Sequence, residues 1–138
     1  MEPIKEFKDN KELMDCLNEW KERLFLRDWN IQGWLVNSAE IPNLGGKSEV
    51  EWESSCGIIK ICKADQIPRD MIEKFYHEHI MVHELLHFKI MSFENKAPSV
   101  EQVYFDIMQH RLIEHLAKSL IMAKYNLTYE WFYEQEGK

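Results

Sequence analysis

Two imidazoles and a carboxylate lie close together in the segment His83-Glu84-Leu85-Leu86-His87, which reads H-E-x-x-H. On an α-helix, residues four apart share a face, so the two histidines would project from adjacent turns in the same direction. Imidazoles placed in this way can hold one zinc ion at ~2.0–2.1 Å each. Glu84 would lie beside them, close enough to accept a proton from a water molecule without binding the metal. The spacing therefore predicts two metal ligands and a general base for metal-assisted hydrolysis.

A third protein ligand is expected further along the chain, because catalytic zinc sites use three protein ligands and leave one position for water. Two polar residues interrupt an otherwise apolar line on the last predicted helix, which consists of Val103, Ile107, His110, Glu114, Ala117 and Ile121. Buried polar groups need partners, and a shared metal ion is one such partner. We expect His110 to be the third ligand and keep Glu114 as the alternative. The residue that does not bind could orient a ligand by hydrogen bonding.

The remaining histidines and two tyrosines are weaker candidates. His79 lies one turn before the predicted ligands, and we expect it on a helix face near solvent, with a role in orienting a ligand as the alternative. His77 and His115 are also expected at the surface, with stabilisation of an oxyanion as the alternative for His115. Tyr104 and Tyr125 could donate a hydrogen bond to a developing oxyanion, and the sequence does not choose between them.

Three helices are predicted to frame these residues. The first is opened by a capping box, Asp9-x-x-Glu12, and its apolar spacing continues to about Leu26. The second carries the H-E-x-x-H segment and is expected over Pro68–Met91, with proline in its first turn. The last is expected over Ser99–Lys124 and begins with a Ser-x-x-Gln capping box.

A small three-stranded sheet is predicted between the first two helices. Alternating side chains indicate strands at Trp29–Val36, Val50–Cys56 and Ile58–Lys63, with a proline- and glycine-containing loop over Asn37–Ser48. A peptide substrate could add to the sheet beside the Ile58–Lys63 strand. The aromatic segment Tyr129–Tyr133 is expected to pack as a closing segment, with a lid over the cleft as the alternative.

Composition limits the classes of protein to consider. The chain has 138 residues and 45% hydrophobic content, which predicts one domain over residues 1–138. A net charge of -7, from 24 acidic and 17 basic residues, argues against a nucleic-acid partner. No apolar run reaches the ~18 residues of a membrane span, so no membrane partner is expected. The sequence leaves the oligomeric state undefined.

Two further features favour a cytoplasmic protein. The first ten residues are charged and lack the apolar core of an export signal. The cysteines, Cys16, Cys56 and Cys62, are odd in number and form no C-x-x-C pair, so we expect reduced thiols.

The order of these elements, together with the segment from Met81 to His87, resembles minimal zincin metallopeptidases, particularly the short proteins of this kind found in prophages and mobile elements. The order covers nearly the whole chain, whereas only that segment is a specific match. In gluzincin-like relatives the third ligand is typically a glutamate on the closing helix, and alignment places His110 there, with Glu114 as the nearest glutamate. The metzincin pattern is absent, because Ile90 and Phe93 occupy its glycine and histidine positions.

The resemblance implies an α+β, zincin-like fold with an N-terminal helix, a small three-stranded sheet, a metal-site helix and a long closing helix. It also implies a Zn²⁺-dependent peptidase that hydrolyses a protein or peptide substrate with a metal-activated water and Glu84 as general base. The alternative is a non-catalytic, zinc-binding interaction or regulatory protein on the same scaffold. A closed site with four protein ligands would favour that alternative, and an open coordination position would favour the enzyme.

Overall fold

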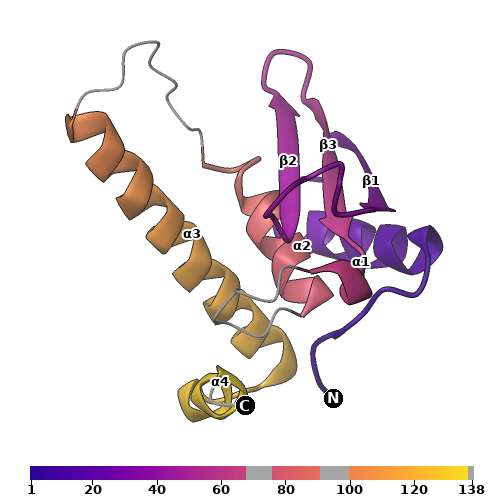
Figure 1. The fold of residues 1–138 in the computed structure, drawn as a ribbon, viewed down its shortest axis with the longest axis vertical. Helices are drawn as coiled ribbons and strands as arrows, with labels where there is room; N and C mark the ends of the chain where they lie inside the picture. The colour runs from indigo at the N-terminus through magenta and orange to yellow at the C-terminus, as the bar shows by residue number, and fades with distance from the viewer. Residues whose placement is uncertain (68–75, 91–99, 137–138) are drawn as a thin grey trace.

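A three-stranded sheet and four α-helices make up the part of the chain that the computed structural model describes, residues 1–67, 76–90 and 100–136 (Figure 1). This mixed arrangement confirms the predicted α+β class. None of the described helices is long and apolar enough to cross a membrane. In chain order the elements are α1 (Asn10–Arg23), β1 (Asn30–Val36), β2 (Gly46–Glu51), β3 (Cys56–Cys62), the 3-10 helix η1 (Ala64–Gln66), α2 (His77–Leu86), α3 (Val100–Tyr125) and α4 (Tyr129–Glu136).

The sheet has the strand order β1-β3-β2, with β3 parallel to β1 and antiparallel to β2. The predicted Ile58–Lys63 strand is therefore central, and the expectation that a peptide would add beside it is wrong, because β3 is paired on both sides. The strand β2 is at one edge of the sheet instead. No other strand among the described residues pairs with its outer side.

The strand predicted over Val50–Cys56 is shifted in the structure. β2 begins at Gly46, inside the predicted loop, and ends at Glu51, after which the chain turns. Ser55 closes this turn in the left-handed region, with a φ of 52°. The alternation of acidic and other residues runs on through the turn, so the period-2 pattern did not mark the end of the strand.

Helix α1 begins where the sequence predicts. The Asp9 side chain caps it by accepting a hydrogen bond from the backbone N–H of Glu12 at 2.9 Å. The helix ends at Arg23 rather than near Leu26, because Phe25 takes a left-handed φ of 60°. Its buried face packs against the sheet and consists of Leu13, Cys16, Leu17 and Trp20.

Helix α2 lies between the sheet and α3 (Figure 1) and is buried along nearly its whole length. It begins at His77, since Tyr76 is extended, with φ −96° and ψ 137°. A continuous helix through Tyr76 is therefore wrong, and the predicted start at Pro68 lies outside the described residues. The N-terminal segment lies along the first turn of α2, where the N–H groups of His77 and Glu78 donate to the carbonyls of Lys5 and Ile4.

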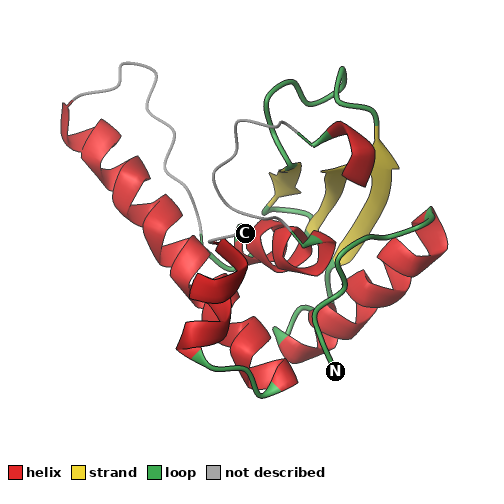
Figure 2. Cartoon of the chain, turned by 60° about the horizontal axis from the view of Figure 1, so that its bottom comes forward, coloured by secondary structure: helices red, strands yellow, loops and turns green. Residues whose placement is uncertain are grey.

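Helix α3 runs alongside α2, and a short connection leads from its end to α4 (Figure 2). Its buried line is Gln109, Ile113, Ala117, Ile121 and Tyr125, each four residues after the last. The predicted inward positions Val103 and Ile107 are 51% and 53% exposed, so that part of the prediction is wrong. The first turns of α3 extend past α2 (Figure 1), and Val100, Tyr104 and Met108 there are 71%, 65% and 68% exposed. On α4, Phe132 is buried, as expected of a packed closing segment.

Candidate metal centre

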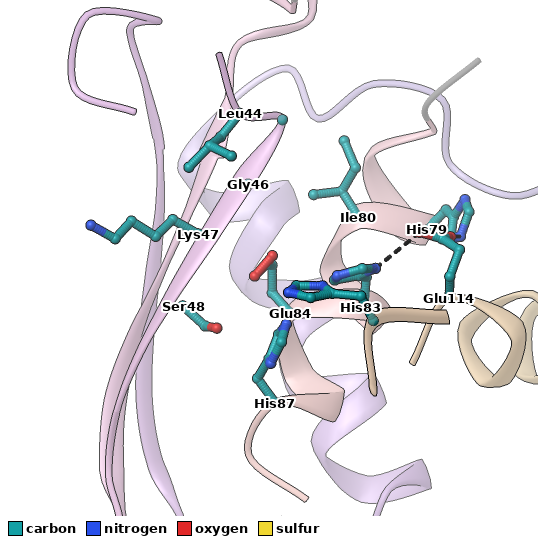
Figure 3. Close-up of a pocket in the computed structure, with 12 residues that line it drawn as sticks. Leu44, Gly46, Lys47, Ser48, His79, Ile80, His83, Glu84, His87 and Glu114 are labelled. Carbon is teal, nitrogen blue, oxygen red and sulfur yellow. Dashed lines mark hydrogen bonds and ion pairs between the residues drawn. The ribbon is translucent and has the colours of Figure 1, made fainter. Parts of the chain in front are cut away.

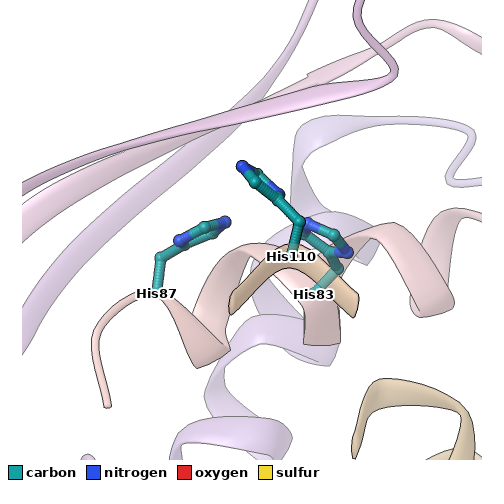
Figure 4. A group of neighbouring side chains, drawn as sticks. All are labelled: His83, His87 and His110. Atoms are coloured by element: carbon teal, nitrogen blue, oxygen red, sulfur yellow. The ribbon is translucent and has the colours of Figure 1, made fainter. Parts of the chain in front are cut away.

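Three histidines converge on one point between α2 and α3 (Figure 4). His83 and His87 come from α2 and His110 comes from α3, and one ring nitrogen from each lies within 4.8 Å of the others. The first two side chains are half-buried and the third is exposed. The structure thus brings together the three residues that the sequence favoured as ligands. Among the described residues no other group of this kind could hold a metal ion.

The two helices place these rings by different means. His87 is the C-cap of α2 and keeps helical backbone angles, φ −63° and ψ −21°, so its ring remains on the same face as that of His83. Their ring centroids are 5.4 Å apart. On α3, Ile113 and Ala117 are fully buried, and His110 lies one turn before Ile113. Its ring therefore reaches the histidines of α2, with centroids 6.3 Å from His83 and 5.7 Å from His87.

Glu114 contacts two histidines of α2 instead of joining the three converging rings. Its Oε2 lies 3.1 Å from Nδ1 of His83, and its Oε1 contacts Nε2 of His79. Because an ionised carboxylate only accepts hydrogen bonds, Nδ1 of His83 must donate, which leaves Nε2 for a metal. Burial opposes the charge on Glu114, but the two histidine contacts outweigh it and hold its pKa well below the usual range. This geometry matches the orienting role that the sequence left open for the residue that does not bind.

Burial keeps the lone pair of His87 available for a metal ion. It lowers the pKa of His87 to about 4, and the neighbouring charges of His83 and His110 act in the same direction. Since a metal ligand must be an unprotonated imidazole nitrogen, this ring is ready to bind at neutral pH.

Glu84 lies on the side of His83 opposite Glu114, toward β2 (Figure 3). The residue is only 6% exposed, and burial raises the pKa of its carboxyl group to about 7. The positive charge of His83 and a hydrogen bond from Ser48 act against this rise, whereas Glu114 adds to it. A carboxyl group with such a pKa can exchange a proton near neutral pH, as the predicted general base must.

A pocket of about 440 Å³ opens at this point, and β2 forms one wall of it (Figure 3). Gly46 permits the close approach of this wall, since a Cβ there would lie 2.6 Å from Cγ2 of Ile80 and 3.2 Å from Cγ of Glu84. The sequence pattern did not predict this wall, because Gly46 lies within the predicted loop. The lining residues are Leu44, Gly45, Gly46, Lys47, Ser48, His79, Ile80, His83, Glu84, His87, His110 and Glu114.

Two histidines expected at the surface are buried. His79 is 4% exposed, because α4 covers that part of α2 and places Phe132 with its ring centroid 6.4 Å away. His77 is 0% exposed, because the N-terminal segment covers it. Its Nδ1 accepts from the backbone N–H of Phe7 at 2.6 Å, and its Nε2 lies 3.0 Å from the carbonyl oxygen of Cys62, to which it donates. Burial lowers the pKa of His77, consistent with a neutral ring.

The other candidates are also placed. His115 is exposed, as predicted. Tyr104 is 65% exposed and does not line the pocket. Tyr125 is buried and donates its hydroxyl to Glu78, so it is not available as an oxyanion donor.

Three imidazole nitrogens are a donor set that suits Zn²⁺ and other borderline transition-metal ions, so the residues present fit the expected metal. The cysteines are not part of the cluster: Cys16, Cys56 and Cys62 are free thiols elsewhere in the fold. The sequence matches no protein-family model, and no significant match was found among curated proteins or solved structures.

Proposed function

We propose that this chain is a zinc-dependent peptidase in which His83, His87 and His110 hold the metal ion and Glu84 is the general base. One observation carries the proposal: three histidines converge beside a buried carboxylate in a pocket bordered by an edge strand. Three protein ligands leave one coordination position for a small molecule, as catalytic zinc sites do. The resemblance to minimal zincins supports the same function.

The chemistry divides between the metal and the protein. When bound, Zn²⁺ supplies Lewis acidity, which lowers the pKa of water and polarises a carbonyl group. Glu84 accepts a proton from the attacking water and later donates it to the amine that leaves. Burial favours the neutral form of Glu84, so this carboxylate accepts a proton more readily than an exposed one does. Glu114 holds the ring of His83 in the orientation that points Nε2 toward the ligand cluster.

An extended peptide is the substrate that the pocket suits best. The outer edge of β2 carries backbone groups that can pair with a peptide strand, and β2 residues line the pocket beside Glu84. Leu44 and Ile80 provide apolar contacts in the same pocket. We place the activity in the cytoplasm as part of this proposal, because free thiols are typical of a reducing compartment.

Metal content and hydrolysis of a fluorogenic peptide library test the proposal together. We expect about one zinc ion per wild-type chain, and its loss in a folded His110→Ala protein. His115→Ala is the matched control, since it removes an exposed histidine from the same helix and should keep both metal and activity. Glu84→Gln should keep the metal and lower kcat by about 10²–10⁴-fold, the usual contribution of a general base.

Two results would reject the proposal. A folded wild-type protein that binds no metal after zinc is supplied would exclude the metal centre. A Glu84→Gln protein with undiminished hydrolysis would exclude this residue as the base.

The second candidate function is a non-catalytic, zinc-binding interaction protein. Exposed apolar side chains on α3 favour it, since such side chains suit a partner surface: Val100, Val103, Tyr104, Phe105, Ile107, Met108, Leu112 and Leu116. Full zinc occupancy with no hydrolysis in the library would support this candidate over the peptidase.

A further inference from the structure

Glu114 is a potential fourth metal ligand that lies outside the ligand cluster. It lines the same pocket as the three histidines and lies one helical turn after His110. Carboxylate oxygens also bind Zn²⁺, at about 2.0–2.2 Å. A fourth protein ligand would close the site and exclude water or substrate. The centre would therefore be closed if the Glu114 carboxylate bound the metal, and open if it did not.

Both oxygens of Glu114 are engaged by residues of α2. Oε2 lies 3.1 Å from Nδ1 of His83, and Oε1 contacts Nε2 of His79. Beyond this contact, neither Oε1 of Glu114 nor Nε2 of His79 has a hydrogen-bond partner within the described ranges. The contact is shielded from water, because the His79 side chain is only 5% exposed. Polar contacts in such surroundings are stronger than the same contacts in water.

The ring of His79 is itself held in place. Phe132 of α4 packs edge-on against it, at 69° between the ring planes. Figure 3 shows His79 and Glu114 together on one side of His83, with Glu84 on the opposite side. With His83 as its only anchor, the carboxylate could rotate about its own side-chain bonds toward the metal. The contact with His79 removes this freedom.

We propose that His79 is a positioning residue that holds Glu114 against His83 and so keeps one coordination position of the metal centre open. The inference rests on the proposed function, because it concerns the same metal centre. It assigns a role to a histidine that neither binds the metal nor exchanges a proton with substrate. It also gives a reason for a buried histidine one turn before the ligands.

Cobalt(II) is a suitable probe, since its visible absorption spectrum reports coordination number and its response to azide reports an open position. We compare full-length wild type with His79→Leu, His79→Gln and the double variant His79→Leu/Glu114→Gln, each checked for folding by circular dichroism. In His79→Leu we expect Glu114 to occupy the open position and the apparent azide affinity to fall at least about tenfold. Removing the carboxylate in the double variant should restore the azide response. His79→Gln should resemble wild type, because its amide can still donate to Glu114.

Each remaining outcome counts against the inference. An azide response in folded His79→Leu equal to that of wild type would overturn it while leaving the peptidase proposal intact. A lost response that the double variant does not restore would also overturn it, since the cause would then be general distortion. If His79→Leu does not fold, Glu114→Gln decides in its place: the inference expects an azide response equal to that of wild type, and an enhanced response would overturn it, because Glu114 would already bind the metal. A wild type that binds no cobalt or zinc would reject the metal centre and this inference together.

Discussion

Helix α2 carries two buried glutamates whose carboxylates have opposite surroundings. Glu78 is 0% exposed, and Glu84, less than two turns further, is 6% exposed. The Glu78 carboxylate accepts hydrogen bonds from the backbone N–H of Ile4, Trp20 Nε1, Lys124 Nζ and the Tyr125 hydroxyl. For Glu84 a hydrogen bond from Ser48 is the comparable contact. The same residue type is therefore saturated with donors at one end of the helix and has few at the other.

The pKa values follow this difference. Burial alone would raise both, but the four donors around Glu78 outweigh it and lower its pKa. At Glu84 burial dominates, and its pKa rises to about 7. A carboxylate that stabilises a fold is kept charged, whereas one that transfers protons must change its charge near neutral pH. Glu78 thus stabilises the fold as a charged group, whereas the surroundings of Glu84 suit the role of general base that we propose for it.

Identical substitutions at the two sites provide the strongest test of this comparison. Glu78→Gln should lower the free energy of unfolding by about 3–5 kcal/mol, because it removes the buried counter-ion of Lys124. Glu84→Gln should not lower it at pH 8, because it removes a buried charge that has few donors. Urea unfolding of the metal-free proteins measures both, and equal losses at the two positions would contradict the comparison.

The pH dependence of stability should also distinguish the two glutamates. Glu84 has a pKa of about 7 in the folded protein against an ordinary value of 4.5, so the folded state binds more protons between these values. Its contribution therefore makes the metal-free protein less stable as pH rises from about 4.5 to 7, by up to roughly 3 kcal/mol. Glu78 acts in the opposite direction: its lowered pKa stabilises the fold above the ordinary value, and this contribution is lost as pH falls.

Subtracting two unfolding curves isolates the Glu84 contribution. The difference in unfolding free energy between Glu84→Gln and wild type should grow across pH 4.5–7 and level off above it. Urea titrations with EDTA present measure it at each pH. A difference that stays constant with pH would mean that Glu84 does not titrate abnormally.

The parts of the site that could be predicted from the sequence are those placed by the spacing of residues within one helix. His83, Glu84 and His87 share one helix, so helical spacing alone places their side chains together. The prediction of His110 required only that the last helix return alongside α2, and the structure places His110 beside the other two histidines. Helical spacing does not show whether Glu114 binds the metal or orients a ligand, because that depends on which side chain of α2 faces it.

The missed features depend on contacts between distant segments. The burial of His77 and Glu78 requires the N-terminal segment to lie along α2, and the burial of His79 requires α4. No local pattern in the sequence reports either contact. Local signals succeeded where the cause was local, as with the Asp9 cap of α1, and failed at the end of β2, where alternation continued into a turn.

Glu19 provides the test with the smallest expected effect, because it is the other carboxylate that pairs with Lys124, and it also pairs with Arg23 at the surface. Its Oε2 lies 3.0 Å from Lys124 Nζ, but its side chain is 42% exposed, whereas that of Glu78 is 0% exposed. Glu19→Gln should therefore cost only about 0.2–1 kcal/mol, and added salt should reduce that cost further. Urea unfolding at low and high salt measures both effects. A loss as large as that of Glu78→Gln would mean that the charge of Lys124 needs both partners equally. Glu78 and Glu19 would then stabilise Lys124 equally, despite the difference in their burial.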